Sequence, residues 1–137
     1  MIKMHRLLFI DDDRSQQMVF KLLVRLKQFP FEVECFTDPL EALKYLENLT
    51  DEQFPDVIIS DIKMPCIDGF ELADIYLEKY HKNHLKTIFI ISSSTIRLED
   101  IQQAEDHPAV NFFVEKPFDK EKVMQFILEP LSSMISV

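Results

Sequence analysis

The sequence predicts an α/β fold with a doubly wound, five-stranded parallel sheet that is covered by helices on both faces. Short apolar runs alternate with longer amphipathic stretches five times along the 137 residues. Four of the five runs are continuously apolar, which is typical of strands buried on both faces. Right-handed crossovers between successive parallel strands place helices on both sides of such a sheet. We therefore expect one domain over residues 1–137.

The first strand–helix unit begins with the apolar run RLLFI at residues 6–10, which predicts a buried strand. The stretch 15–29 has apolar residues at helical spacing, and Pro30 marks its end because proline cannot continue a helix. We expect the apolar face of this helix to consist of Met18, Leu22, Leu26 and Phe29.

The second unit begins with FEVECF at residues 31–36, whose alternating pattern predicts a half-buried strand. The helix after it has a clear start. Asp38 is a good N-cap, Pro39 suits the first helical position, and Glu41 follows the cap by three residues.

The last three units repeat this order. Strands are predicted at 56–60 (DVIIS), 87–91 (TIFII) and 110–114 (VNFFV), and helices at 70–80, 97–106 and 119–128. Asp119 is the expected cap of the last helix, which should end or kink at Pro130 because of the missing N–H group.

The composition excludes several classes of function. The formal net charge is −9, which argues against a nucleic-acid surface because phosphate backbones require clustered basic residues. A single glycine excludes a Walker loop and a dinucleotide fingerprint. No apolar run is long enough for a signal peptide or a membrane span. Cys35 and Cys66 lack metal-ligand spacing, so we expect reduced thiols in a cytoplasmic protein.

Polar side chains follow the ends of four predicted strands. Ligands of a doubly wound sheet bind outside the carboxyl ends of its strands, so these residues are the candidate site. They are Asp11, Asp12 and Asp13 after the first strand, Asp61 after the third, Ser92, Ser93 and Ser94 after the fourth, and Lys116 after the fifth.

The chemistry of this set predicts a magnesium-dependent phosphoryl site. Oxygen ligands without nitrogen or sulfur suit a hard cation such as Mg²⁺. A bound cation would also offset the repulsion between the clustered carboxylates. An aspartate beside Mg²⁺ and a lysine can act as a nucleophile toward phosphorus and form an aspartyl phosphate.

Four stretches resemble the signature motifs of response regulator receiver domains: FIDDD, PDVIISDIKMPCIDGFEL, IFIISS and FFVEKPF. The second contains the pattern DxxMPxxDG, and all four occur in the order and at the spacing typical of the family. The resemblance covers nearly the whole chain. It implies a flavodoxin-like (βα)5 fold with strand order 2-1-3-4-5. It also implies a single receiver domain of the chemotaxis-regulator type, without an attached output domain.

The resemblance implies a role for each residue of the acidic edge. Asp61 would be the phosphoacceptor, and Asp11 and Asp12 would form the acidic pair that binds Mg²⁺. Asp61 and the backbone carbonyl of Lys63 would be further ligands of the metal. Lys116 would pair with the phosphoryl oxygens.

Two further residues, Ser92 and Phe113, would form a switch. Ser92 would donate a hydrogen bond to the phosphoryl group and move toward it, and Phe113 holds the aromatic switch position. The family usually has threonine and tyrosine at these two positions, so the tyrosine hydroxyl is absent here. Core packing is the alternative role of Phe113, since a strand sends Phe112 and Phe113 to opposite faces.

The implied function is two-component signal transduction. A sensor histidine kinase or a phosphotransfer protein would donate the phosphoryl group from a phosphohistidine. The chain would then signal to an unidentified downstream protein through the surface of its fourth helix, fifth strand and fifth helix. It would catalyse only its own phosphorylation and dephosphorylation, and neither nucleic acid nor a membrane is an expected partner.

Three other interpretations remain open. The acidic run could be a helix N-terminus, which would explain one residue, Asp13, better than three. Asp11 and Asp13 also match the DxD motif of haloacid-dehalogenase-type phosphohydrolases, although that family leaves the motif around Asp61 unexplained. A receiver-like interaction module that is never phosphorylated is the third, and the complete set of acidic, serine and lysine residues argues against it.

Overall fold

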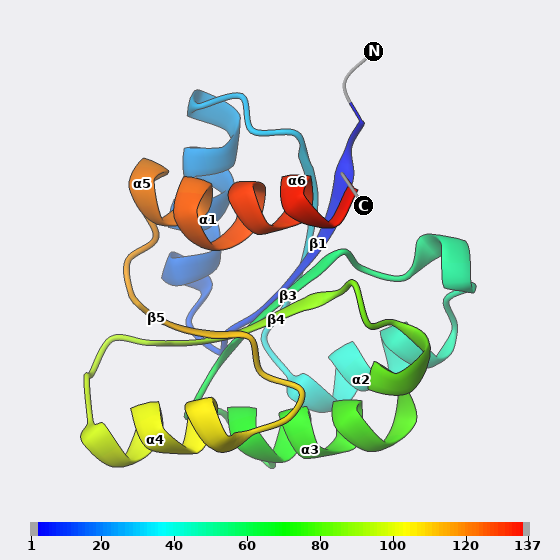
Figure 1. Ribbon diagram of the computed structural model, residues 1–137. Helices are drawn as coiled ribbons and strands as arrows, with labels where there is room; N and C mark the ends of the chain where they lie inside the picture. Colours follow the sequence, from blue (N-terminus) through cyan, green and yellow to red (C-terminus); the bar gives the residue numbers. More distant parts are fainter. Residues whose placement is uncertain (1–2, 136–137) are drawn as a thin grey trace.

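Five parallel strands form one sheet in the order β2-β1-β3-β4-β5 in the computed structural model, which describes residues 3–135 (Figure 1). The predicted fold class and strand order are therefore confirmed. The strands are β1 (His5–Ile10), β2 (Phe31–Phe36), β3 (Val57–Asp61), β4 (Ile88–Ser93) and β5 (Phe112–Glu115).

Helices cover both faces of the sheet. α1 (Arg14–Leu26), α5 (Lys120–Val123) and α6 (Glu129–Ile135) lie on one face, and α2 (Pro39–Glu47), α3 (Gly69–Lys79) and α4 (Leu98–Asp106) lie on the other (Figure 1). Short segments complete the chain: the 3₁₀ turns η1 (Asp51–Gln53) and η2 (His81–Asn83), and the π-helical segment η3 (Met124–Leu128).

The core consists of two layers, one on each face of the sheet. Successive strand side chains point to opposite faces, so Leu7 and Phe9 pack beneath α1, α5 and η3, whereas Leu8 and Ile10 pack against α2, α3 and α4. β3 and β4 are buried along almost their whole length. This explains their continuously apolar sequences.

The buried face of α1 differs from the predicted one. Phe20 and Val24 are buried, whereas the side chains of Met18 and Leu26 are 71% and 69% exposed. Both stripes have helical spacing, so periodicity alone could not choose between them. The Phe20 ring stacks on Phe9 at a centroid distance of 4.7 Å, and this contact fixes which stripe faces the sheet.

α1 is also shorter than predicted. The helix ends at Leu26, and Gln28 adopts a positive φ of 54° before the chain turns into β2. The turn therefore begins before Pro30 is reached.

The C-terminal helix does not end at Pro130. The helical path continues through α6 to Ile135, and the expectation of an end there is wrong. Immediately before the proline, the Glu129 N–H donates to the carbonyl of Met124, five residues back, in the wide π turn of η3. A proline has no N–H group and crowds the carbonyl four residues before it. The wide turn lies at the point where that crowding would occur.

Within residues 3–135, no helix is both long enough and apolar enough to cross a membrane. Cys35 and Cys66 are both unpaired. Cys35 is partly buried and Cys66 is exposed.

We expect Phe20→Ala to lower the free energy of unfolding by about 3–5 kcal/mol, because the ring is buried against Phe9 and Phe118. Met18→Ala should change it by about 0.5 kcal/mol or less, because the side chain lies in solvent. Urea unfolding of both variants measures the difference. Equal losses would contradict the assignment of the buried face.

Candidate functional site

Four polar residues of the predicted site point to the same face of the sheet. Each follows, by two positions, a core residue of the layer beneath α1 and α5, and side chains two apart on a strand share a face. The strand register also pairs Asp61 directly with Ser92. The four residues are Asp11, Asp61, Ser92 and Lys116.

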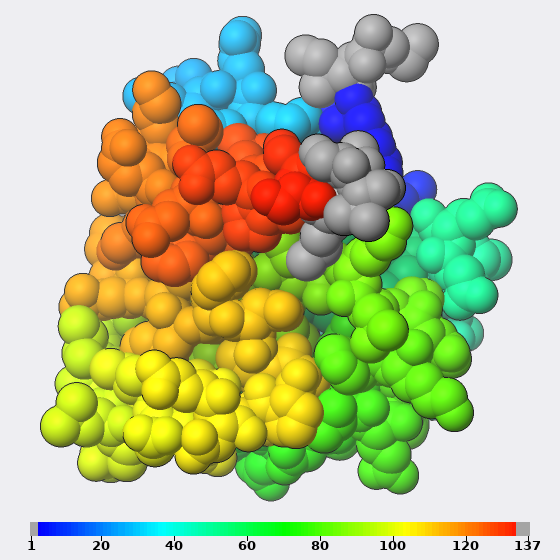
Figure 2. All heavy atoms as spheres, in the orientation of Figure 1, coloured from blue at the N-terminus to red at the C-terminus, as the bar shows by residue number. Residues whose placement is uncertain are grey.

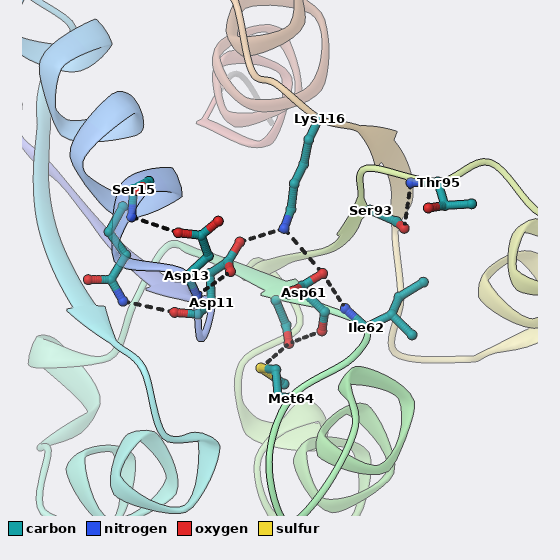
Figure 3. Close-up of polar contacts among 11 residues, drawn as sticks. Asp11, Asp13, Ser15, Asp61, Ile62, Met64, Ser93, Thr95 and Lys116 are labelled. Atoms are coloured by element: carbon teal, nitrogen blue, oxygen red, sulfur yellow. Dashed lines mark hydrogen bonds and ion pairs between the residues drawn. The ribbon is translucent and has the colours of Figure 1, made fainter.

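The ammonium group of Lys116 bridges two of these carboxylates (Figure 3). Its Nζ atom lies 2.5 Å from Oδ2 of Asp11 and 3.2 Å from Oδ1 of Asp61. The side chains of Lys116 and Asp11 are only 7% and 1% exposed. Charges this far from water are costly unless they are paired. The pairing therefore ties the end of β5 to the ends of β1 and β3.

Three carboxylates form a group that could hold a metal ion. Oxygen atoms of Asp11, Asp12 and Asp61 all lie within 4.8 Å of one another, with Asp11 buried and Asp12 exposed. Three negative charges and the positive charge of Lys116 leave a formal charge of −2 (−3 + 1). This donor set is all oxygen, and its charge matches a divalent ion, so the residues fit Mg²⁺.

The electrostatic environment raises the pKa of the Asp61 carboxyl group above its ordinary value. Partial burial is the largest cause because it disfavours the charged form, and the nearby Asp11 carboxylate adds to it. Lys116 and the Ile62 N–H, which donates to Asp61 Oδ1 at 2.8 Å, oppose the shift. An additional cation beside this carboxyl group would favour its ionised form.

The loop after β1 orients Asp11 and uses Asp13 for a different purpose. The Asp13 N–H donates to Oδ1 of Asp11 at 2.9 Å (Figure 3). The Gln17 side chain donates to the Asp11 carbonyl at 3.0 Å. Asp13 itself is the N-cap of α1 and accepts from the Ser15 N–H at 2.8 Å. It therefore stands outside the carboxylate group. The helix-cap interpretation is right for Asp13 alone.

Gly69 packs against the backbone of Asp61, and it was not among the predicted site residues. The helix was predicted to begin at residue 70, but Gly69 is already the first residue of α3 and is buried. A Cβ atom at this position would lie 2.2 Å from the carbonyl oxygen of Asp61, and the Gly69 N–H donates to the Ile62 carbonyl at 2.7 Å. Only glycine fits this close approach. Gly69 is the single glycine of the sequence, and this was the signal that could have marked it as a special backbone position.

Ser92 and Ser93 have different surroundings. The Ser92 side chain is buried, and its hydroxyl has no hydrogen-bond partner among residues 3–135. The hydroxyl of Ser93 accepts from the Thr95 N–H at 3.1 Å. Ser93 also lines a cavity of about 140 Å³ beside Asp61, together with Lys63 and Arg97 among others. Arg97 was not among the predicted site residues.

Phe113 lies between the core and the surface. It is partly buried and packs against the layer of α2, α3 and α4, whereas Phe112 packs in the opposite layer, with its ring centroid 5.3 Å from that of Phe126. The two rings therefore point to opposite faces of the sheet, as expected for neighbours on a strand.

A comparison with protein families finds a match over residues 7–128 to the response regulator receiver domain. Among curated proteins, the chain is 30% identical over 125 residues to the sensory transduction protein LytT of Bacillus cereus, covering 89% of this chain and 45% of LytT. The chain spans less than half of the length of the curated relatives that it matches.

Solved structures agree with this match. A two-component response regulator from Cytophaga hutchinsonii is 26% identical with a TM-score of 0.86, and 96% of this chain and 99% of that chain are covered. A CheY-like receiver domain protein from Methanospirillum hungatei is 25% identical with a TM-score of 0.77, and 98% of each chain is covered. This chain belongs to the response regulator receiver domain family and is a receiver domain of two-component signal transduction.

Proposed function

We propose that the chain accepts a phosphoryl group on Asp61 from a phosphohistidine of a sensor histidine kinase or phosphotransfer protein, in a Mg²⁺-dependent reaction. The observation that carries this proposal is the buried Lys116 ammonium group, which bridges Asp11 and Asp61 beside a third carboxylate. A cytoplasmic location is part of the proposal, because thiols stay reduced there and both cysteines are unpaired.

Asp61 is the nucleophile of the proposed reaction. One of its carboxylate oxygens attacks phosphorus in line with the N–P bond of the phosphohistidine. The O–P bond forms as the N–P bond breaks, and the imidazole nitrogen keeps that electron pair and takes a proton from water. Phosphoryl transfer needs positioning and neutralised charge more than covalent help. Lys116 supplies a fixed positive charge next to the attacking group.

Asp11, Asp12, Asp61 and the backbone carbonyl of Lys63 would hold Mg²⁺. The ion would neutralise charge on the transferring phosphoryl oxygens. Lys63 is exposed and lines the cavity beside Asp61, which is consistent with this assignment. In this proposal, the chain acts chemically only on its own aspartate.

The response to phosphorylation begins at Ser92 and Lys116. A phosphoryl group adds about −1.5 to −2 units of charge and three strong acceptor oxygens. The buried Ser92 hydroxyl, which has no partner in the described part of the chain, would donate to one of these oxygens. Phe113 pairs in register with Ile91, the residue before Ser92, so a movement at the end of β4 would also reach the backbone beside Phe113.

The surface that would carry the signal consists of α4, β5 and α5. α4 and β5 are in contact, and Figure 2 shows α4 in yellow and α5 in orange on the same face of the molecule. The large apolar side chains of Ile96, Leu98 and Met124 are exposed on or next to these elements. They could provide contacts for a downstream protein.

The exposed stripe of α1 would receive the phosphodonor. Met18, Val19, Leu22 and Leu26 are all exposed, although the sequence predicted that most of them face the core. Every charged residue of α1 is basic, in a chain whose net charge is −9. α1 begins directly after the carboxylate group, so a partner that reaches Asp61 can also contact this helix. An acidic, amphipathic helical donor fits the stripe.

The two alternative functions differ in what they require of the chain. A haloacid-dehalogenase-type phosphohydrolase would need Asp13 in the catalytic group, but Asp13 caps α1 instead. The comparisons also favour the receiver family over that enzyme class. A receiver-like module that is never phosphorylated would gain no mass on incubation with a phosphoryl donor, so a mass gain would exclude it.

Incubation with acetyl phosphate and Mg²⁺ should raise the intact mass of the chain by one phosphoryl group. Asp61→Asn should abolish the gain, because the amide lacks a nucleophilic oxygen. Intact-mass spectrometry measures both. Asp13→Asn is the matched control: asparagine is an equally good N-cap, so this variant should be phosphorylated as fast as the parent chain.

Two results would contradict the proposal. One is a mass gain that persists in Asp61→Asn, which would place the phosphoryl group on another residue. The other is a folded parent chain that gains no mass from acetyl phosphate or from any phosphohistidine donor of a kinase panel, which would support the interaction module.

The raised pKa of the Asp61 carboxyl group predicts a pH-dependent stability. The folded chain keeps this proton to a higher pH than the unfolded chain, so stability falls as the pH rises from the ordinary value through the raised one. Asp61→Asn removes this titration. In the absence of divalent cations, the variant should be more stable than the parent chain at pH 7, and its advantage should shrink below about pH 4.

Thermal unfolding with and without Mg²⁺ tests this expectation. Mg²⁺ should stabilise the parent chain more than Asp61→Asn, because at a given concentration a ligand of the folded state stabilises it more when it binds more tightly. If Asp61→Asn were less stable than the parent chain at pH 7, the charged Asp61 carboxylate would not destabilise the folded state, and the expectation would be wrong.

Met18→Glu should slow phosphoryl transfer from a protein donor by about tenfold or more, because it places an acidic group in the apolar and basic stripe. It should leave the reaction with acetyl phosphate unchanged. Rapid-quench transfer from a donor that phosphorylates the parent chain measures both. Leu40→Glu, at an exposed position on the opposite face of the sheet, is the control. Equal effects of the two variants would exclude α1 as the docking surface.

A further inference from the structure

Lys116 must be held by its backbone, because its long side chain has to deliver one ammonium group to two carboxylates. On its N-terminal side, the Lys116 N–H donates to the Ser93 carbonyl at 2.9 Å and continues the pairing of β5 with β4. On its C-terminal side, the next residue is Pro117, which has no N–H group to donate. The strand pairing therefore fixes only one side of Lys116.

Lys122 contacts the backbone on both sides of Lys116. Its Nζ atom donates to the carbonyl of Glu115 at 2.7 Å and to the carbonyl of Pro117 at 3.1 Å. These carbonyls belong to the residues immediately before and after Lys116. One ammonium group thus joins the last residue of β5 to the turn that leads into α5.

The Lys122 backbone is itself anchored. Its N–H donates to Oδ1 of Asp119, the N-cap of α5, at 2.8 Å. Lys122 is partly buried, whereas Lys120 on the same helical turn is exposed and has no side-chain hydrogen bond or ion pair among the described residues. A cation in the first turn of a helix is disfavoured by the helix dipole. The two carbonyl contacts offset this for Lys122.

We propose that Lys122 is a positioning residue: by clamping the carbonyls of Glu115 and Pro117, it fixes the turn that aims the Lys116 ammonium group at Asp11 and Asp61. Hydrogen bonds from an ammonium group are stronger than those between neutral groups. Lys122 acts through Lys116 alone and touches no carboxylate of the site. The effect on phosphorylation rests on the proposed function of Asp61 and Lys116.

Loss of the clamp should change the reaction without changing metal binding. The Asp13 N–H holds the Asp11 carboxylate and the Ile62 N–H holds that of Asp61, so Mg²⁺ affinity should remain within about twofold of the parent value. The rate of phosphorylation by saturating acetyl phosphate should fall by about tenfold in Lys122→Met, because small displacements of a catalytic group are costly. Lys122→Arg keeps a cationic donor and should recover most of the rate.

Two measurements test the proposal. The first is the phosphorylation rate of Lys122→Met, Lys122→Arg and the matched control Lys120→Met, with Mg²⁺ affinity from calorimetry. The second is the ammonium resonance of Lys116 in chains labelled with ¹⁵N-lysine, assigned by its disappearance in Lys116→Met. A buried, paired ammonium group exchanges its protons slowly, so the parent chain should give a sharp signal. Lys122→Met should shift or broaden it, and Lys120→Met should not.

Three outcomes would overturn the proposal. They are an unchanged rate in Lys122→Met, an equal loss in Lys120→Met, or a slower rate with an unchanged Lys116 resonance. If the parent chain accepts no phosphoryl group, the proposed function fails, and the ammonium resonance alone then decides whether Lys122 positions Lys116.

Discussion

The ion pairing of Lys116 with Asp11 and Asp61 is the interaction on which the rest of the site depends. Buried charges are costly unless their geometry is good and their remaining hydrogen bonds are made. Each partner is therefore held by backbone contacts. The Asp13 N–H orients Asp11, the Ile62 N–H orients Asp61, and the clamp of Lys122 lies around Lys116. The proposed phosphoryl transfer requires such an arrangement in advance, because it depends on positioned charge.

The two-layered core determines which site residues lie on each face of the sheet. The strand alternation that buries Phe9 beneath α1 also sends Asp11 to the same side, so the carboxylate group lies beside the start of α1. Phe113 points to the opposite face of the sheet and packs in the layer that contains α4. Ser92 points to the layer of α1 and α5, so the side chains of Ser92 and Phe113 lie on opposite faces of the sheet. The proposed signalling surface of α4, β5 and α5 therefore draws on both faces, and α5 shares its face with the proposed docking helix α1 (Figure 1).

The sequence predicted the wrong apolar stripe of α1 as its buried face. The helix carries two apolar stripes, and the stripe with Met18 and Leu26 has regular helical spacing, as a buried face would. Core packing used the other stripe because the Phe20 ring stacks on Phe9. An apolar stripe left in solvent is unfavourable for solubility. Its exposure and its basic flanks are the basis of the proposed donor docking, and neither periodicity nor composition could reveal that exposure.

The sequence by itself determined the fold class, the approximate position of the elements and the candidate carboxylates, because apolar runs and helix caps are local signals. The strand order came from the resemblance of its motifs to receiver domains, and the structure confirms that order. Only the tertiary structure decided which of three consecutive aspartates caps a helix, why Gly69 has to be a glycine, and that the helix continues past Pro130. It also brought Lys122 to the carbonyls around Lys116. These features depend on contacts that form only when whole helices and strands pack together. No local pattern of residues encodes that packing.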